Sequence, residues 1–399
     1  MTREQEFFLL VLADHIHGRA TNPPEELDWP QIAKYAKSHE VEGIIYHQCK
    51  DYLSKHEELA SVNDRLSRAT AAAMFYYANR MAMAEQIKTK FQQNGIEFFT
   101  VKGDAVAPLY PVPMLRTMGD TDFVIHTQDR QRAYDIMLHL GYENRGTPDK
   151  HEWPYYKNKM EIEIHNCLIY PQVINKDGFE DYFNDFWKYV NNGELDWGFH
   201  FMFLLLHLRK HFMNSGVGFR QFMDLVVVAD AKRDAVDWTW VENELKQLGL
   251  IRFAENCFGF CERWFGTRAP LPVAELEDDF FNSATKKIFI DGIFGFENEE
   301  NSRNVAINEA RTASGPNIAD MFSSALRKAF PSYRSLIDTG HYPFLMGRPL
   351  MLPIAWIYRI FFRGIMLGRT SLGIRLLSNS FTSKEAYHKR DNMLNKWGL

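Results

Sequence analysis

The chain has 399 residues, of which 46% are hydrophobic and 24% are charged, and its formal net charge is −5. This composition excludes a disordered chain and a small disulfide-stapled domain, and the length allows more than one compact unit. The acidic balance argues against a protein that coats nucleic acid. The four cysteines lack paired zinc spacing, the N-terminus is unlike a secretory signal, and no apolar stretch reaches the ~18 residues of a spanning helix, so we expect a cytoplasmic protein.

Residues 1–95 carry apolar side chains at helical spacing. The strongest pattern runs over 63–94, with Asn63 as a candidate cap and Gly95 as a stop. We therefore expect an N-terminal helical segment that ends in one long helix, preceded by shorter helices around residues 7–13, 29–37 and 41–53.

The apolar period changes to that of strands over residues 96–172. Strand patterns at 96–101 and 120–125 are separated by a short helix, 105–110, and by a loop that contains prolines. A helical pattern and three further strand-like stretches follow. This alternation predicts a small α/β unit, whose remaining elements are expected at residues 128–140, 142–144, 153–156 and 160–168.

Residues 173–340 return to helical patterns, except for a polar stretch at 295–316 that is expected to form a loop or hairpin. The last segment, 341–399, has nine Lys/Arg and two Asp/Glu, so it carries +7 and the rest of the chain −12. The sequence thus predicts an α+β fold, in which a small mixed β-sheet core at 96–172 is flanked by helical segments at 1–95 and 173–340 and followed by a basic amphipathic tail. The later helices are expected at residues 199–214, 220–232 and 238–248.

The basic tail has two interpretations. Its stretch from 347 to 377 is largely apolar with scattered arginines, and Arg359 and Arg363 share a helix face. One interpretation is an interfacial helix on anionic lipid, which would make the protein membrane-peripheral. The other is a helix docked on the acidic body, with its arginines solvated or paired.

Asp120 and Asp122 open the strand pattern at 120–125. Alternate residues of a strand point to one face, so the two carboxylates project together with their Cα atoms about 6.6 Å apart. At an effective dielectric near 20 they repel by roughly 2 kcal/mol, and a divalent cation turns that repulsion into attraction. Acidic pairs at this spacing also arise by chance, so the residues alone leave a metal site and an exposed strand start open.

A second acidic strand pattern follows at 160–165, where Glu161, Glu163 and His165 alternate with isoleucines and share a face. If this strand lies beside the first, three carboxylates converge. Oxygen ligands arranged in this way hold two magnesium ions, one of which activates the attacking oxygen while the other steadies the leaving phosphate.

These segments resemble a known family. The Lys102-Gly103 strand end, the Leu115-Arg116 loop, the Gly-Asp-Thr-Asp strand at 119–125 and the Leu-Gly-Tyr helix end at 140–142 are similar to motifs of the uncharacterised nucleotidyltransferase family of bacteria, within the polymerase-beta-like superfamily. A later acidic-hydrophobic-His strand of that family matches 163–165. The resemblance covers most of the chain between residues 60 and 265, and in the helical part it extends to His207, Lys210, His211, Gly216, Gly218, Arg220 and Asp224.

The resemblance implies a catalytic metal site for Mg²⁺ or Mn²⁺. Asp120, Asp122 and Glu163 would be its ligands, and Glu163 would also be a candidate general base for the acceptor hydroxyl. Glu161 lies on the same face of its strand and competes for the third position.

The resemblance also implies a nucleotide-binding set around the loop before the acidic strand. Lys102 would approach the triphosphate of the NTP, and Gly103 would let backbone amides close on it. Gly119 and Arg116 complete this set, although Arg116 has an ion pair with Asp104 or Glu97 as its alternative. The chain departs from the better-known members of the superfamily at Asp104, where they have serine.

The helical part adds candidate cleft residues. His207 and His211 lie four apart on a helix, which suits zinc, but no HExxH motif or third ligand accompanies them, so packing or substrate contact competes with a metal site. Arg220 follows a Gly-x-Gly stretch that suits a phosphate loop, and the alternative is a turn with an Arg220–Asp224 helix pair. The expected cleft residues are Glu161, His165, His207, His211, Arg220 and Asp224.

We therefore expect a metal-dependent nucleotidyltransferase that moves a nucleoside monophosphate from an NTP to a hydroxyl of an unidentified acceptor. Proteins that it resembles accompany bacterial surface-polysaccharide genes, which suggests a sugar or glycan acceptor; no specific nucleic-acid partner is expected. The missing serine hydroxyl at Asp104 favours an alternative, a binding or scaffold module that has lost catalysis. A further alternative is an enzyme that nucleotidylates hydroxyl side chains of proteins.

Overall fold

The computed structural model describes residues 1–144, 152–169, 179–214, 216–293, 343–345, 347–358 and 384–399, with a few isolated positions between 330 and 336. The chain forms two compact units. The first contains Met1–Lys210, Val217–Phe294 and Gly398, and the second contains His211–Gly216, Gly295–Trp397 and Leu399. The sequence-based division into four segments remains a prediction.

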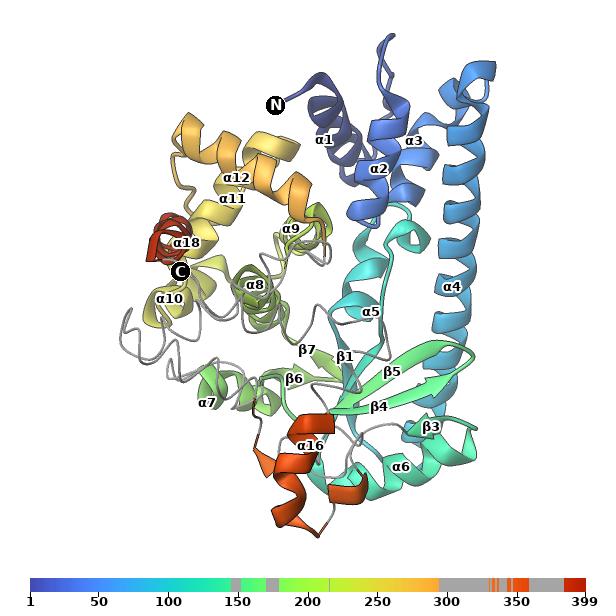
Figure 1. Cartoon of the computed structure of the whole chain (residues 1–399), viewed down its shortest axis with the longest axis vertical. Helices are drawn as coiled ribbons and strands as arrows, with labels where there is room; N and C mark the ends of the chain where they lie inside the picture. Colours follow the sequence, from blue (N-terminus) through green and yellow to red (C-terminus); the bar gives the residue numbers. More distant parts are fainter. Residues whose placement is uncertain are drawn as a thin grey trace. The chain divides into compact units, whose positions relative to one another are not determined.

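The first unit begins with four helices, as the apolar spacing predicts: α1 (Arg3–Ile16), α2 (Trp29–Ser38), α3 (Glu42–Leu53) and α4 (Ala60–Gln93), with the 3₁₀ turn η1 (Glu57–Leu59) before the last. Helix α4 is 34 residues long and runs along one side of Figure 1. It begins three residues earlier than predicted and has no side-chain cap, so Asn63 is not its cap. It ends before Gly95, whose φ of 63° is a backbone conformation that favours glycine, and the predicted stop is confirmed.

Five strands form a mixed sheet in the order β1-β2-β5-β4-β3. Its centre is the parallel pair of β2 and β5, and the other neighbouring pairs are antiparallel. The predicted α+β fold with a small mixed sheet is therefore confirmed. The strands are β1 (Phe98–Val101), β2 (Asp122–Ile125), β3 (Glu143–Asn144), β4 (Glu152–Lys157) and β5 (Met160–His165).

One face of this sheet packs on helices. Phe123 and Ile125 of β2 and Ile162 and Ile164 of β5 join a buried cluster with side chains of α4 and α6 (Arg130–His139). Alternate strand residues point to opposite faces, so the acidic side chains of β2 and β5 lie on the face away from this core. Three short helical elements lie between β1 and β2: α5 (Gly103–Val106), η2 (Ala107–Leu109) and η3 (Pro113–Leu115). A fourth, η4 (Thr127–Asp129), lies between β2 and α6.

The remainder of the first unit is mostly helical. The three helices predicted here are confirmed, with ends within two residues, as α8 (Trp197–Asn214), α9 (Phe219–Ala231) and α10 (Trp238–Gln247). Aromatic side chains of α1, α9 and α12 surround His39, which directly follows α2. The other elements are α7 (Phe179–Asn184), η5 (Phe186–Tyr189), β6 (Val190–Asn191), β7 (Glu194–Leu195), α11 (Ile251–Phe265) and α12 (Asp278–Asp291).

The described part of the second unit includes η6 (Pro343–Leu345), η7 (Pro349–Met351), α16 (Leu352–Tyr358) and α18 (Lys384–Trp397). Leu336, Leu345 and Ala355 form its small buried cluster. Arg359 and Arg363, like the predicted loop at 295–316, lie outside the described residues. No helix within the described ranges is long and apolar enough to cross a membrane.

Candidate functional site

The parallel pairing of β2 and β5 brings two carboxylates side by side. Asp122 is the register partner of Glu163, and Val124 is the partner of His165. The backbone N–H of Glu163 donates to the carbonyl of Thr121 at 2.8 Å, which holds the start of β2 against β5. The predicted convergence of the two acidic strands is thus present in the structure.

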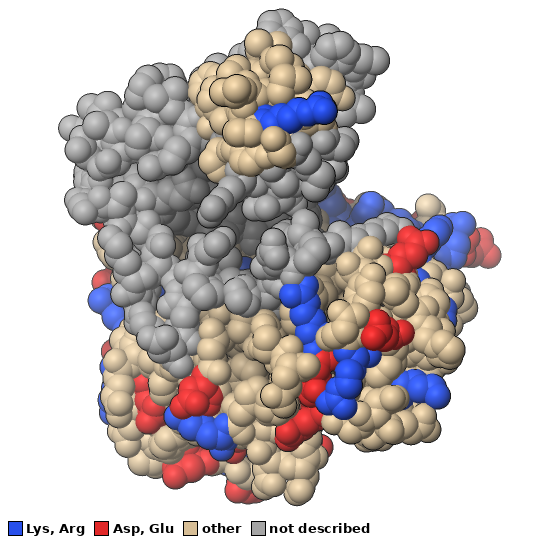
Figure 2. Space-filling model, turned by 90° about the horizontal axis from the view of Figure 1, so that it is seen from below, with Lys and Arg blue, Asp and Glu red and all other residues tan. Residues whose placement is uncertain are grey.

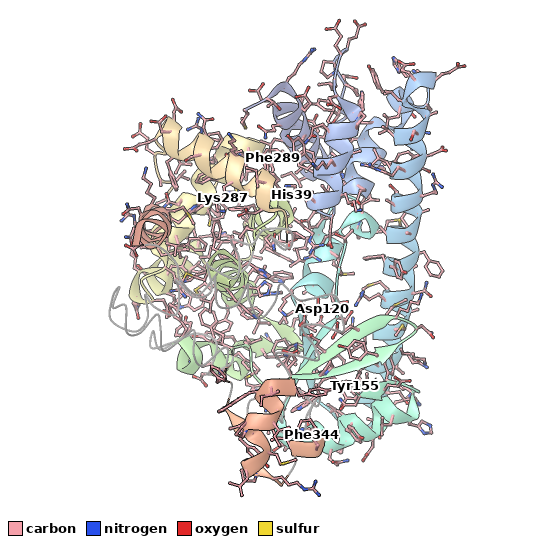
Figure 3. The ribbon with its side chains drawn as sticks, viewed as in Figure 1. His39, Asp120, Tyr155, Lys287, Phe289 and Phe344 are labelled. Carbon is pink, nitrogen blue, oxygen red and sulfur yellow. The ribbon has the colours of Figure 1, made fainter. Side chains whose placement is uncertain are left out.

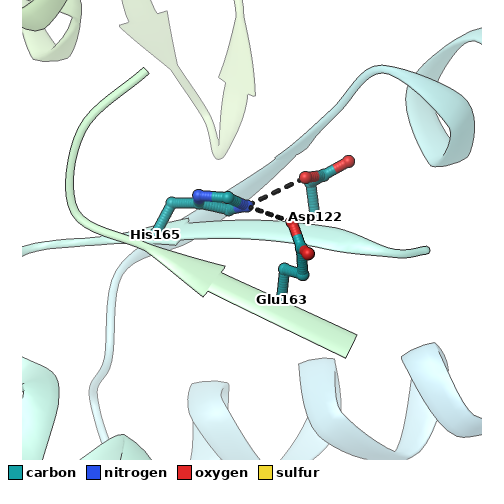
Figure 4. Close-up of side chains that lie close together, drawn as sticks. All are labelled: Asp122, Glu163 and His165. Carbon is teal, nitrogen blue, oxygen red and sulfur yellow. Dashed lines mark hydrogen bonds and ion pairs between the residues drawn. The ribbon is translucent and has the colours of Figure 1, made fainter. Parts of the chain in front are cut away.

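His165 joins these two carboxylates (Figure 4). Its Nε2 lies 2.9 Å from Asp122 Oδ1 and 3.3 Å from Glu163 Oε2. One potential ligand atom from each of the three side chains lies within 4.8 Å of the others, and among the described residues this is the group that could hold a metal ion. Sequence reasoning placed His165 in the cleft but not among the ligands.

The chemistry of this group fits a divalent cation. Asp122 is 1% exposed, and no group in the described part of the chain donates a hydrogen bond to its Oδ2. A buried carboxylate oxygen without a donor is costly unless a cation or water approaches it. Carboxylate oxygens suit Mg²⁺ and Mn²⁺, whereas an imidazole nitrogen favours softer transition-metal ions.

Lys102 places a positive charge at the same carboxylate. Its Nζ lies 2.7 Å from Asp122 Oδ1, and its φ of 54° is rare for a residue with a side chain. The backbone N–H of Lys102 donates to His200 Nε2 at 3.1 Å, so α8 supports this strained turn. His200 was not identified from the sequence, because a lone histidine in an apolar helix carries no local signal of this contact.

Asp120 lies just before β2, two residues earlier than the observed start of the strand (Figure 3). It does not belong to the close group of three side chains. The charge of Asp122 and burial raise the pKa of Asp120, while Lys102 acts in the opposite direction. Asp120 is therefore within electrostatic reach of the group, and its role as a ligand remains a prediction.

Buried charges around the group shift its protonation equilibria. Burial would raise the pKa of Asp122, but Lys102 and His165 outweigh it and hold that pKa below its usual range. Burial would lower the pKa of His165, but its contacts with Asp122 and Glu163 raise it to about 9. Burial, with the nearby charge of Asp122, raises the pKa of Asp104 to about 7.

Asp104 is buried beside the strand ends and accepts a hydrogen bond from Thr121 Oγ1 at 3.3 Å. Its Oδ2 has no partner among the residues that the structure describes. Gly103, directly before it, is closely surrounded, since an added Cβ would lie 2.9 Å from Arg116 Nη1 and 3.0 Å from Met118 Sδ. A larger residue here would therefore displace the ends of the Arg116 and Met118 side chains.

Arg116 binds Asp224 rather than extending from its loop. Its Nε donates to Asp224 Oδ1 at 2.9 Å and its Nη2 to Oδ2 at 2.7 Å, and the Tyr110 hydroxyl donates to Oδ1 at 2.7 Å. Both charged groups are buried. These hydrogen bonds connect the loop before β2 to α9. The predicted contact of Arg116 with the triphosphate would therefore require the ion pair with Asp224 to break.

Arg220 also has a partner other than the helix neighbour Asp224. Its Nη1 lies 2.8 Å from Glu40 Oε2 and 2.9 Å from the Thr117 carbonyl. The alternative considered from the sequence, an i,i+4 pair of Arg220 with Asp224, is not formed, because Arg116 occupies Asp224. Arg220 instead connects α9 to Glu40, in the turn after α2, and to Thr117, in the loop before β2.

The other predicted site residues have varied surroundings. Glu161 accepts a hydrogen bond from the Tyr156 hydroxyl, which directs it toward β4. Gly119 is exposed in the loop before Asp120. His207 is half-buried on α8 in the first unit, whereas His211 belongs to the second unit, and neither belongs to a potential metal-binding group within the described residues.

Lys210 on α8 interacts electrostatically with the same group of side chains. Burial and the charge of Lys102 lower the pKa of Lys210, while Glu152, Glu163 and Asp122 act in the opposite direction. The site therefore combines carboxylates from two strands with lysines from two other elements. Such a combination suits a polyanion that binds together with a metal ion.

Comparison with known proteins identifies one family. A family model described as an uncharacterised nucleotidyltransferase matches residues 25–266, a range that contains Asp120, Asp122, Glu163, His165 and Lys102. No curated protein and no solved structure matches the chain.

Proposed function

Because the chain belongs to the uncharacterised nucleotidyltransferase family, we propose that it transfers a nucleoside monophosphate from an NTP to a hydroxyl group of an acceptor. Asp120, Asp122 and Glu163 are the proposed ligands of Mg²⁺ or Mn²⁺, and His165 is a further candidate. The observation that carries this proposal is the meeting of Asp122, Glu163 and His165 on neighbouring parallel strands.

In the proposed reaction the acceptor oxygen forms a bond to the α-phosphorus of the NTP, and the bond from that phosphorus to the bridging oxygen of pyrophosphate breaks. Glu163, whose pKa burial raises, accepts the proton of the acceptor hydroxyl. A bound divalent cation would neutralise charge on the phosphate oxygens. Pyrophosphate leaves with the electron pair of the broken bond.

Lys102 is the proposed contact for the triphosphate. Its ammonium group already lies at the carboxylate group, and its side chain is partly exposed. Gly103, Gly119 and Arg116 remain candidates for the nucleotide site, and Arg116 would serve it indirectly by holding the loop through Asp224. Lysine binds phosphate as a point charge, so a modest movement of the Lys102 side chain suffices.

Calorimetry of the full chain with Mn²⁺ and a non-hydrolysable NTP tests this function. The wild type is expected to bind the nucleotide only weakly without the metal ion and more tightly with it. Asp120→Ala should remove that gain, and the exposed Lys159→Met should retain it. Absence of metal-dependent nucleotide binding by the wild type would refute the proposal.

A module that binds without turnover is the second candidate, and Asp104 favours it. This buried carboxylate stands where the resemblance places a serine hydroxyl, and its negative charge would repel a phosphate bound nearby unless it carries a proton. Pyrophosphate release in the presence of sugar acceptors separates the two candidates. Intact-mass measurement of proteins incubated with ATP and Mg²⁺ tests the third, transfer to a protein hydroxyl.

We also propose that the tail at 341–399 contacts an anionic membrane surface. Leu350, Ile354 and Ile357 of η7 and α16 are 93%, 51% and 58% exposed, and residues 343–358 contain Arg348 but no acidic residue. In the space-filling view of Figure 2, the tan patch in the upper part carries blue but no red. Apolar exposure with basic charge suits an interface with anionic lipid.

Vesicle pelleting of the full chain tests this contact. Vesicles that contain phosphatidylserine should bind the wild type, and Ile354→Asp with Ile357→Asp should abolish this binding. Equal pelleting of the wild type and the double variant would refute a role for α16. Equal binding to neutral and anionic vesicles would refute the role of charge.

A further inference from the structure

Arg80 is a buried cation beneath the strands that carry the candidate ligands. It lies on α4, is 5% exposed, and shares a helix face with Ala84, Ile87 and Phe91, which pack on the sheet. A charged group in such a position is costly unless hydrogen bonds compensate for the lost water. The partners of Arg80 therefore indicate what its burial achieves.

Among the described residues, Arg80 has three hydrogen-bond partners, and all of them lie at or beside candidate ligands. Its Nη2 donates to the Gly119 carbonyl at 2.9 Å, directly before Asp120. Its Nη1 donates to the Glu161 carbonyl at 3.0 Å, and lies 3.3 Å from the hydroxyl oxygen of Thr121, between the two aspartates. One guanidinium group thus joins the start of β2 to β5.

The pairing of β2 with β5 is short and places two carboxylates side by side. Strands β2 and β5 pair over only three register positions, and the first of these places Asp122 beside Glu163. Two carboxylates at this separation repel each other when both are charged. Helix α4, which carries Arg80, packs on the sheet face of Phe123 and Ile164, so Arg80 acts from the side of the sheet that Asp122 and Glu163 do not use.

The charge of Arg80 also acts on the carboxylates. The charge of Asp122 and burial raise the pKa of Asp120, and both Lys102 and Arg80 oppose this effect. Lys102 contacts Asp122 through its side chain, whereas Arg80 hydrogen-bonds the backbone beside the ligands. The two cations therefore have different roles, although both favour ionised aspartates.

We propose that Arg80 is a positioning residue that holds Asp120, Asp122 and Glu163 in the spacing required for metal binding. This inference rests on the proposed function for the identity of the ligands. A planar guanidinium can donate to two carbonyls in fixed directions, whereas an ammonium group cannot span both in the same way. The role therefore requires arginine in particular.

The test compares Arg80→Met, Arg80→Lys and the control Arg132→Met with the wild type. Arg132 also donates to a backbone carbonyl, that of Asn94, but it lies on α6. Its hydrogen bonds within the described residues go to Asn94 and Asp129, which lie outside β2 and β5. Each variant is first shown to be folded by circular dichroism and thermal unfolding. Mn²⁺ affinity is then measured by calorimetry, and amide hydrogen exchange by mass spectrometry in peptides that cover 119–125 and 160–165.

Arg80→Met is expected to lower Mn²⁺ affinity by about tenfold or more, as loss of a group that orients metal ligands does. Exchange should accelerate in both peptides, Arg80→Lys should recover part of each effect, and Arg132→Met should change neither. Wild-type affinity and exchange in Arg80→Met, or a loss of thermal stability alone, would overturn the inference. If the wild type itself binds no Mn²⁺, the metal-dependent function fails, and the exchange measurement still decides whether Arg80 holds the two strands.

Discussion

Buried histidines in two regions of the first unit have opposite surroundings. At the strand ends, His165 contacts Asp122 and Glu163, and these contacts overcome burial and raise its pKa to about 9. In the aromatic helical region, His39 is surrounded by Phe8, Phe219 and Phe289, and burial lowers its pKa to about 3. Figure 3 labels His39 and Phe289 in this region. The same side chain is charged in one region and neutral in the other.

The difference shows that counter-charges, rather than depth of burial, decide whether an interior group stays ionised. A raised folded pKa means that His165 contributes stability below the unfolded pKa of about 6.5, and that this contribution is lost as pH rises through the folded value. A lowered folded pKa means that the titration of His39 has no effect on stability above about 6.5, and that stability is lost as pH falls below this value. Charged, paired groups suit chemistry on phosphates, whereas the neutral aromatic region suits packing.

The largest expected effect comes from breaking the buried ion pair between Arg116 and Asp224. Arg116→Met leaves Asp224 without its guanidinium partner and should cost about 3–5 kcal/mol of unfolding free energy. Urea denaturation measures it. The surface pair Lys246–Glu242 is the control, since Lys246→Met should cost no more than about 0.5 kcal/mol. A loss from Arg116→Met as small as that of the control would show that buried pairing does not stabilise this region.

The next prediction distinguishes the roles of Glu161 and Glu163, which lie on the same face of β5. Glu163→Gln removes the proposed proton acceptor beside His165 and should lower metal-dependent transfer by about 100-fold or more. Glu161→Gln should cause a much smaller loss of activity, because the Glu161 carboxylate accepts a hydrogen bond from Tyr156 and is directed toward β4. Initial rates of pyrophosphate release give both values. The reverse order of the two losses would assign the third ligand to Glu161.

The aromatic region gives a smaller effect that depends on pH. His39 has no hydrogen-bond partner for either ring nitrogen among the described residues. At pH 5.5 the unfolded chain binds a proton at this position that the folded chain excludes, which costs about 1.4 kcal/mol of stability. His39→Leu should remove this part of the loss between pH 7.5 and 5.5, as measured by urea denaturation at both values. An identical pH dependence in the variant would contradict the assignment, and His139→Leu on the exposed side of α6 is the control.

The smallest effect concerns Lys102, whose ammonium group lies at the same carboxylate that a metal ion would use. Lys102→Met should raise Mn²⁺ affinity in the absence of nucleotide by about threefold, because an opposing cation near Asp122 is removed. Affinity for the NTP should fall in the same variant. Calorimetry with the metal ion alone and with both ligands measures the two changes. A fall in both affinities would show that Lys102 supports the metal site rather than competing with it.

Much of the site was predictable from local patterns. Alternation along β2 and β5 placed Asp122, Glu163 and His165 opposite the isoleucines, and these side chains meet as expected. The start of β2 was predicted two residues too early, so Asp120 lies in the preceding loop. Arg80 also had a signal, since it interrupts an apolar helix stripe with Ala84 and Ile87, although its partners were not visible.

Contacts between distant segments were not predictable in this way. Asp224 had an arginine four residues before it, yet it binds Arg116, which is 108 positions away in the chain. The backbone of Lys102 meets His200 across 98 positions. Local spacing favours the nearest partner, whereas packing selects the partner whose geometry allows two charged hydrogen bonds.

The sequence by itself determined the five strands of the mixed sheet to within three residues at their ends, the long helix with its stop at Gly95, and the face on which the acidic side chains of β2 and β5 lie. These features depend on periodicity and on the conformational preferences of single residues, which neighbouring residues carry. Only the tertiary structure decided that β5 lies beside β2 in the register that pairs Asp122 with Glu163, and that Arg80 supports this junction from the opposite face. Register and buried charge partners depend on the packing of segments far apart in the chain, because a buried charge is stable only where that packing supplies its counter-charges and hydrogen bonds.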